Sequence, residues 1–532
     1  MSKPDILIRG GQVIDGTGAR AIEADVAIAD GRIAAVAPKL SGDATRVIDA
    51  RGLVVAPGFI DIKTHSDWTL PLNVKAESKI RQGVTTEVIG HCGYSCAPVL
   101  PGKAALLRDY LSPSAPWLSF IDQSFADYLG GFPATSTNVV PLVGHNTLRL
   151  MVMGLANRRA GSDELEAMAA LLEAALDAGA YGFSTGLFTP PGAFAATDEI
   201  VALAKIVRAK GGRYFTHLRD EANAVFDALD EAITVGREAG VHVQVVHLKL
   251  SGLDNWGKAG ELLERLESAR KMGVAIDCDQ YPYTAASNPL KNLLSRWVQS
   301  DDLGEMQGRL AEPANRTRIR HEIAGAGLNN FGRIKDWDAI RISVSPNTPQ
   351  FAGRTMGELA REVGADPVDR VCDYLIADKC ATRVLVDSIS EDDIQTMIRS
   401  PHVCVGSDGN CVAPYGVTGQ GRPHPRFYGT FPRILGHYCR DLGLIDLPRA
   451  IWKMTGLSAQ ALGFADRGLL RPGYAADVTI FDPAEFAERA SYADPHQYPA
   501  GQATTVLVNG TITVDHAEHT GALAGKLLRR AA

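Results

Sequence analysis

At 532 residues the chain is too long for one ordinary domain, and it suits a large barrel with one accessory domain. A formal net charge of −7 and a pI near 6.0 argue against nucleic acid as a partner. No run of about 18 apolar residues occurs, so the sequence predicts no membrane span.

The N-terminus begins polar and lacks the long apolar core of a signal peptide, which favours a cytoplasmic protein. The eight cysteines are scattered along the chain, so we expect reduced thiols and no disulfide scaffold. One thiol could then serve as a metal ligand. A homo-oligomer stays open.

Both ends of the chain are rich in short strands. Alternating apolar and polar residues predict strands at 6–9, 12–16, 24–28, 476–481 and 505–510. Gly10-Gly11, Asp30-Gly31 and Asn509-Gly510 are turn signals. We predict one small β-sandwich domain built from residues 1–57 and 466–532. Two unrelated β appendages are the alternative.

The middle of the chain, 58–465, alternates helical segments with apolar runs that end in polar residues. The runs cover 59–65, 86–92, 139–145, 182–187, 213–217, 241–247, 276–283 and 403–408. Amphipathic patterns predict helices at 163–178, 198–210 and 221–239. Eight such units predict an α/β fold, a TIM (β/α)8 barrel. A doubly wound sheet is the alternative, but only a barrel brings all the strand ends around one mouth.

A long segment separates the last two predicted barrel strands. Residues 285–345 are interpreted as an insertion at the barrel mouth, with helices at 288–297 and 305–323. Segments of that length over an active face often form lids or pocket walls.

The first predicted barrel strand carries an unusual pair of polar residues. The apolar run before it stops at Pro57-Gly58, and Lys63 and His65 close the strand that follows. The two side chains point the same way because side chains alternate along a strand. Two ligands on one strand face are the usual beginning of a metal site, but a protonated Lys63 cannot ligate zinc and would repel it.

Three further strand ends carry metal-binding residue types. His217 and His247 lie 30 residues apart, about one β/α repeat, and neutral imidazole is a good zinc ligand. Cys92 ends another strand, and a thiolate binds zinc tightly. Separate polar caps and a buried hydrophobic cysteine are the alternative. Three such residues at one barrel mouth favour a Zn²⁺ site, whereas Cys96 is interpreted as a packing residue.

Asp408 ends the last predicted barrel strand, in the sequence VCVGSDG. A carboxylate beside a metal-bound water can take a proton from it and pass that proton to a leaving amine. An ordinary Asp-Gly turn is the alternative. The position of Asp408 at the mouth of a metal-binding barrel favours the role of catalytic acid and base.

Long motifs then point to a known family. PGFID, GVTTEVIG-x-CG, YGFSTGL, THLRDE, HLKLSG, DQYPYTA, GSDG, RPHPRFYGTFPRILGHY and WKMTGLSA occur in this order. Together they resemble the D-aminoacylases, the N-acyl-D-amino-acid deacylases of the amidohydrolase superfamily. The resemblance covers nearly the whole chain and includes its C-terminal end.

The resemblance implies roles for individual residues. Cys92, His217 and His247 match the ligands of a tight zinc site, and Asp408 matches the catalytic acid and base. His65 matches one ligand of a weaker second metal, whose other His position holds Lys63. The positions that match holders of the substrate carboxylate are Lys249, Tyr281, Ser287 and Arg426. Two cations and two hydroxyls would suit a carboxylate independently of the family, although surface salt bridges are the alternative for the cations.

The sequence therefore predicts a zinc-dependent hydrolase that cleaves the amide bond of N-acyl-D-amino acids, with one tight Zn²⁺. Another amide, a cyclic amide or a xenobiotic amide is the alternative substrate, since fold does not determine substrate. A metal-impaired, non-catalytic homologue is the alternative of a different class, because Lys63 departs from the pattern. Deprotonation of Lys63, or compensation by His91, would reconcile that position with a second metal. The role of His145 stays open between packing and support of the site.

Overall fold

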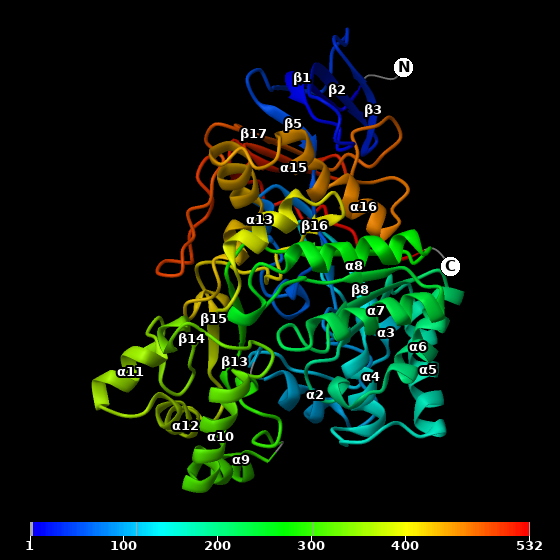
Figure 1. Ribbon diagram of the computed structural model, residues 1–532. Coiled ribbons are helices and arrows are strands. Elements are labelled where there is room, and N and C mark those ends of the chain that lie inside the picture. Colours follow the sequence, from blue (N-terminus) through cyan, green and yellow to red (C-terminus); the bar gives the residue numbers. More distant parts are fainter. Residues whose placement is uncertain (1–3, 113, 301, 531–532) are drawn as a thin grey trace.

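The computed structural model describes residues 4–112, 114–300 and 302–530, and its centre is a barrel of eight parallel strands (Figure 1). These strands are β6 Phe59–Asp61, β7 Val84–Ile89, β8 Asn138–Gly144, β9 Gly182–Gly186, β10 Arg213–His217, β11 Val243–Val245, β12 Ile276–Gln280 and β16 Val403–Val405. Neighbouring strands are hydrogen-bonded, and a parallel bridge between Thr64 and Gly409 joins the last to the first. All eight predicted strands, and the TIM barrel, are confirmed.

Helices follow the strands and cover the barrel from outside. They are α1 Glu77–Ile80, α2 Ala104–Leu111, α3 Phe125–Gly130, α4 His145–Met153, α5 Ser162–Asp177, α6 Thr197–Ala209, α7 Val225–Ala239, α8 Ala259–Lys271, α13 Glu391–Arg399, α14 Arg426–Arg433, α15 Leu447–Met454 and α16 Gly456–Leu462. In α5 the buried residues Met168, Leu172 and Ala175 recur every three or four positions and pack on the barrel. The helices predicted at 163–178 and 198–210 are confirmed by α5 and α6.

The helix predicted from residue 221 begins four residues later, at Val225. The Asp220 carboxylate accepts hydrogen bonds from the backbone N–H groups of Ala222 and Ala224, at 2.8 and 2.9 Å, and this turn replaces the first helical turn. Glu221 therefore lies on a loop at the barrel mouth.

The two ends of the chain share one nine-stranded sheet, in which β5 pairs with β17 (Figure 1). Its strands are β1 Ile6–Val13, β2 Ile22–Ala29, β3 Arg32–Ala37, β4 Arg46–Asp49, β5 Val54–Pro57, β17 Val478–Phe481, β18 Thr505–Val508, β19 Thr511–Asp515 and β20 Glu518–His519. The turn predicted at Gly10-Gly11 is wrong, because β1 continues through both glycines with a register shift that leaves one residue unpaired. The hairpins at Asp30-Gly31 and Asn509-Gly510 are confirmed, with positive φ at all four residues.

Between β12 and β16 the chain forms a cap beside the barrel mouth (Figure 1). The cap contains the antiparallel strands β13 Ala285–Pro289, β15 Arg383–Asp387 and β14 Ile340–Val344, and the helices α9 Leu303–Ala311, α10 Pro313–Ala326, α11 Met356–Val363 and α12 Pro367–Ala377. The helix predicted at 288–297 is wrong, because its first two residues, Asn288 and Pro289, belong to β13, which pairs with β15. The helix predicted at 305–323 is split at Pro313, which lacks an N–H group and begins α10. Among the described helices, none is both long and apolar enough to cross a membrane.

Candidate active site

The carboxyl ends of the barrel strands open into a cavity of about 990 Å³. Among the described residues, His65, Cys92, His217, His247 and Asp408 all line it. Each of them lies at or just after the end of a different barrel strand. The closure of the sheet therefore gathers five predicted site residues that are far apart in the sequence.

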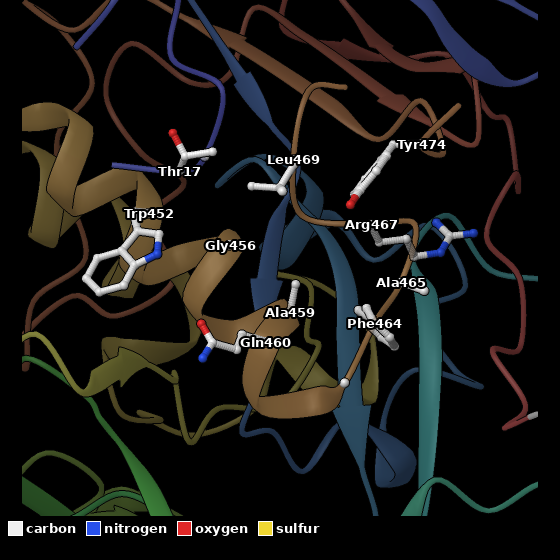
Figure 2. Close-up of a pocket in the computed structure, with 12 residues that line it drawn as sticks. Thr17, Trp452, Gly456, Ala459, Gln460, Phe464, Ala465, Arg467, Leu469 and Tyr474 are labelled. Atoms are coloured by element: carbon white, nitrogen blue, oxygen red, sulfur yellow. The ribbon is translucent and has the colours of Figure 1, made fainter. Parts of the chain in front are cut away.

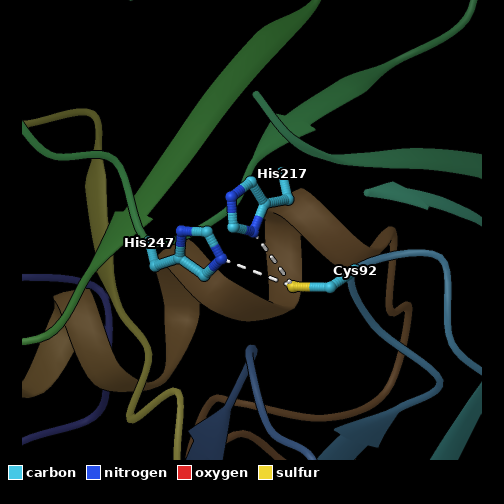
Figure 3. Close-up of side chains that lie close together, drawn as sticks. All are labelled: Cys92, His217 and His247. Carbon is cyan, nitrogen blue, oxygen red and sulfur yellow. Dashed lines mark hydrogen bonds between the residues drawn. The ribbon is translucent and has the colours of Figure 1, made fainter. Parts of the chain in front are cut away.

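Cys92, His217 and His247 converge on one point (Figure 3). Cys92 Sγ lies 3.5 Å from His217 Nδ1 and 3.4 Å from His247 Nε2. Tetrahedral zinc, with bonds of about 2.3 Å to sulfur and about 2.0 Å to nitrogen, would separate such atoms by about 3.5 Å. The three atoms therefore fit one zinc ion, and three protein ligands are typical of catalytic zinc sites.

Three residues at the barrel mouth have a backbone conformation that is sparsely populated in proteins. Cys92, His247 and Asp408 have positive φ values of 56°, 38° and 48°. Non-glycine residues with such values are uncommon and gather at functional sites. Next to Cys92, Gly93 has a φ of 78°, and a Cβ there would lie 2.3 Å from Asn146 Oδ1. Glycine at this position permits both the positive φ and the close approach to Asn146.

Glu221 supports the ligand cluster, and the sequence analysis missed it. One carboxylate oxygen lies 3.1 Å from His247 Nδ1, and the other lies 3.5 Å from His217 Nε2. Each histidine thus faces Cys92 with one nitrogen and Glu221 with the other. Burial would raise the pKa of Glu221, but the charges of His217 and Lys249 outweigh it and lower that pKa. A signal existed in THLRDE, where an acidic residue follows His217 by four positions.

The opposite side of the mouth already contains a cation. Lys63 is fully buried, and its Nζ lies 2.5 Å from Asp408 Oδ1 and 2.8 Å from His65 Nε2. Burial would lower the pKa of Lys63, but the Asp408 carboxylate dominates and raises it. The ammonium group thus lies between the two side chains that would hold a second metal ion, and this half of the mouth does not fit one.

Asp408 is held by two cations. Besides Lys63, Arg426 Nη2 lies 2.8 Å from Asp408 Oδ2. Burial would raise the pKa of Asp408, but Arg426 and Lys63 hold it well below its ordinary value. The side chain is therefore an ionised carboxylate that faces the same cavity as Cys92, His217 and His247.

The four residues predicted to hold a carboxylate divide into two layers. Ser287 and Arg426 are among the described residues that line the cavity, whereas Lys249 and Tyr281 are not; Arg426, Lys249 and Tyr281 are all nearly fully buried. Lys249 Nζ donates to Glu221 Oε1 at 2.5 Å and lies 2.8 Å from His247 Nδ1. The Arg426 guanidinium lies over the Tyr281 ring, 4.7 Å from its centroid.

Several polar atoms in these layers lack partners. Within the described part of the chain, Arg426 Nε, Arg426 Nη1 and the Tyr281 hydroxyl are buried without a hydrogen bond. Buried donors of this kind carry an energetic cost unless a ligand satisfies them. Their arrangement around one guanidinium suits a carboxylate.

Two other histidines differ in their surroundings. His145 Nε2 lies 2.8 Å from Glu199 Oε1, and Arg149 bonds the second oxygen of that carboxylate, which makes this a buried structural network. His91 is fully buried and packs edge-on against Phe215, with ring centroids 5.3 Å apart. Neither residue belongs to the described cluster of metal-binding atoms.

A second cavity, of about 480 Å³, lies beside α16 (Figure 2). Trp452, Phe464, Arg467 and Tyr474 are among its described lining residues. Arg467 is paired there with Asp477, and the three metal-binding side chains are absent from the described lining. The cavity at the barrel mouth is therefore the candidate active site.

Comparison with known proteins agrees with this geometry. The model of the amidohydrolase family matches residues 46–514. A D-aminoacylase of Alcaligenes xylosoxydans xylosoxydans is 38% identical over 531 residues, which cover 99% of this chain and 98% of that protein.

Solved structures show the same relationship. The N-acyl-D-glutamate deacylase of Bordetella bronchiseptica, complexed with zinc and a phosphonate inhibitor, is 34% identical and superposes with a TM-score of 0.83, covering 99% of this chain and all of that one. A D-aminoacylase described as having a binuclear metal centre, with one-metal activation and second-metal attenuation, is 37% identical with a TM-score of 0.82 and the same coverage. The chain therefore belongs to the D-aminoacylase family of the amidohydrolases.

Proposed function

We propose that this protein hydrolyses the amide bond of N-acyl-D-amino acids and uses one zinc ion. The observation that carries the proposal is the convergence of Cys92, His217 and His247 beside the Asp408 carboxylate in one cavity. Relatives named as D-aminoacylase and as N-acyl-D-glutamate deacylase support the choice of substrate.

Asp408 is the proton carrier of the proposed reaction. When bound by Cys92, His217 and His247, zinc supplies a Lewis acid that polarises the amide carbonyl and makes water acidic. Asp408 accepts a proton from the attacking water and returns it to the amide nitrogen as the C–N bond breaks. Lys63 holds one Asp408 oxygen at 2.5 Å and so orients the carboxylate.

The substrate carboxylate is proposed to bind at Arg426. Its Nε and Nη1 atoms are buried without partners in the described chain, while Nη2 holds Asp408. The Tyr281 hydroxyl is a further buried donor without a described partner, and the Ser287 hydroxyl lies in the cavity wall. Lys249, whose Nζ lies 2.8 Å from His247 Nδ1, contributes positive charge. This arrangement would anchor the free carboxylate and leave the acyl amide near Asp408.

The proposal of a single zinc ion rests on the position of Lys63. A second ion would need lone pairs from His65 and its neighbours, but the Lys63 ammonium already contacts His65 and Asp408. Like charges at this distance in a buried site repel strongly. We therefore expect one zinc ion per chain, and His65 serves as a partner of Lys63 instead of a metal ligand.

The decisive experiment compares N-acetyl-D- and N-acetyl-L-amino acids on protein whose zinc content has been measured. We expect turnover of the D series with about one zinc per chain, and loss of turnover after chelation with recovery on adding zinc. Preference for the L series, or full turnover by metal-free protein, would contradict the proposal.

A further inference from the structure

A fully buried ion pair lies beside the point where the barrel closes. Lys79 is on α1, Asp61 is the last residue of β6, and both side chains are 0% exposed, with Lys79 Nζ 2.8 Å from Asp61 Oδ2. Neither is among the described residues that line the active-site cavity. Burying two charges can cost more free energy than their attraction supplies, so a buried ion pair is weak evidence for stability. The further contacts of this pair are therefore informative.

Both members of the pair contact Ser407, the residue before Asp408. Lys79 Nζ donates a hydrogen bond to Ser407 Oγ at 2.7 Å, and the Ser407 backbone N–H donates to Asp61 Oδ1 at 2.8 Å. Ser407 Oγ in turn accepts a hydrogen bond from the backbone N–H of Gly409 at 3.0 Å. The ion pair thus fixes the backbone on both sides of Asp408.

The backbone of Asp408 depends on such support. Its φ of 48° is uncommon for a residue other than glycine, and such conformations persist where surrounding contacts determine them. β16 ends before Asp408, and β6 and β16 are not paired with each other among the described strands. The segments that follow them are joined by a hydrogen bond from Asp408 N–H to Lys63 O, at 2.9 Å, and by the bridge between Thr64 and Gly409. The ion pair adds a third connection across this seam.

The helix α1, which carries Lys79, is itself held against the chain that follows β16. The backbone N–H of Val412 donates to Ser78 Oγ at 2.9 Å. Gln82 Nε2 donates to the carbonyl oxygen of Phe427, in α14, at 3.0 Å. The position of Lys79 is therefore fixed relative to the segment that contains the active-site carboxylate.

We propose that Lys79 and Asp61 are positioning residues for the Asp408 carboxylate. The pair lies outside the described cavity lining, so it acts through Ser407 and Gly409, which it holds so that the carboxylate between them faces the cavity. This inference rests on the proposed function, in which Asp408 carries the proton. A catalytic group displaced by about 1 Å can lose on the order of 10² in rate, so loss of this support is expected to lower kcat.

The test is a double-mutant cycle between Lys79 and Asp408, measured on the N-acetyl-D-amino acid that the zinc-loaded protein hydrolyses fastest. Lys79→Met should lower kcat on the order of 10-fold, with KM within about twofold and an unchanged zinc content. In the Asp408→Asn background the same change should lower kcat by less than about twofold further, because no carboxylate is left to position.

Lys453 provides a matched control. It is 1% exposed, lies on α15, and its Nζ donates to the carbonyl oxygen of Val403, at the start of β16, at 2.8 Å. Lys453→Met removes a buried ammonium group from the opposite end of the same strand, so it should lower the melting temperature but keep kcat within about twofold. A merely structural role for Lys79 would give this same result. The comparison is decisive even where Asp408→Asn turns over too slowly to measure.

A milder variant tests the same connection if Lys79→Met does not fold. Ser407→Ala removes only the hydroxyl that accepts hydrogen bonds from Lys79 and Gly409. We expect kcat to fall several-fold, on the order of 3- to 10-fold, again with unchanged KM and zinc content.

The outcomes separate this inference from the proposed function. Unchanged kcat in folded Lys79→Met, or in Ser407→Ala if Lys79→Met does not fold, would overturn the positioning role alone. An equal fall in kcat with and without the Asp408 carboxylate would also overturn that role alone. Near-normal turnover by Asp408→Asn would overturn the proton-carrier role and this inference with it.

Discussion

The two sides of the barrel mouth differ in the source of their positive charge. On one side Cys92, His217 and His247 present lone pairs to a single point, with ligand atoms 3.4 and 3.5 Å apart. On the other side Lys63 contacts His65 and Asp408 with a cation that belongs to the chain. We propose that the first side holds a metal ion and that the second, which already contains the Lys63 ammonium, does not. Lys63 accounts for this difference, because its ammonium group contacts both His65 and Asp408.

The largest expected effect comes from breaking the metal-binding side. Cys92→Ala removes the sulfur that both histidines face, so most zinc and most activity should be lost together. Elemental analysis of the purified variant, with circular dichroism to confirm folding, measures this. Full zinc occupancy in the folded variant would show that the cluster is not the metal site.

The next effect concerns the Asp408 carboxylate. Asp408→Asn keeps the shape of the side chain but cannot accept a proton, so kcat should fall on the order of 10² to 10⁴-fold while the zinc content is unchanged. Lys63 and Arg426 would then face an uncharged amide, and a thermal melt checks that the fold survives. Near-normal turnover would refute the proton-carrier role.

The third-largest effect is expected for Arg426, which is proposed to bind the substrate carboxylate. Arg426→Ala removes the guanidinium whose Nε and Nη1 atoms, which lack hydrogen-bond partners among the described residues, are proposed to bind the carboxylate. We expect kcat/KM for N-acyl-D-amino acids to fall on the order of 10²-fold, with a much smaller fall for the corresponding carboxamides. Equal losses on both kinds of substrate would mean that Arg426 acts by holding Asp408 instead.

A smaller effect, on zinc affinity, is expected for Glu221, which contacts His217 and His247. Glu221→Gln keeps the size of the side chain but weakens its contacts with His217, His247 and Lys249. Zinc affinity, measured by competition with a chelator, should fall about 10- to 100-fold. Unchanged affinity would show that Glu221 serves only to neutralise Lys249.

The last variant, Lys63→His, is judged by metal stoichiometry and not by turnover, because Lys63 also orients the Asp408 carboxylate. The new imidazole would lie beside His65 in the segment that follows β6, and the built-in cation would be removed. Elemental analysis in the presence of added zinc should rise from about one ion per chain toward two. Two zinc ions in the unchanged protein, without excess metal, would contradict the assignment of Lys63 as a substitute for the second metal.

The barrel itself could be predicted because its evidence is local. Each strand is a short apolar run ending in a polar residue, and that pattern needs no knowledge of distant residues. The cap was predicted less well. Asn288 and Pro289, the first residues of the helix predicted at 288–297, became part of a strand because β15 pairs with them from almost a hundred positions away, and this pairing overrides the local helical pattern.

The sequence by itself determined the family, the eight barrel strands and the residue types Cys92, His217, His247 and Asp408 at their ends. Only the tertiary structure decided that Lys63 lies between His65 and Asp408, and that Glu221 contacts both His217 and His247. The physical reason is that hydrophobic periodicity along the chain specifies strands and helices. The energies of buried charges depend instead on which distant groups are within a few ångströms, and only chain folding determines those distances.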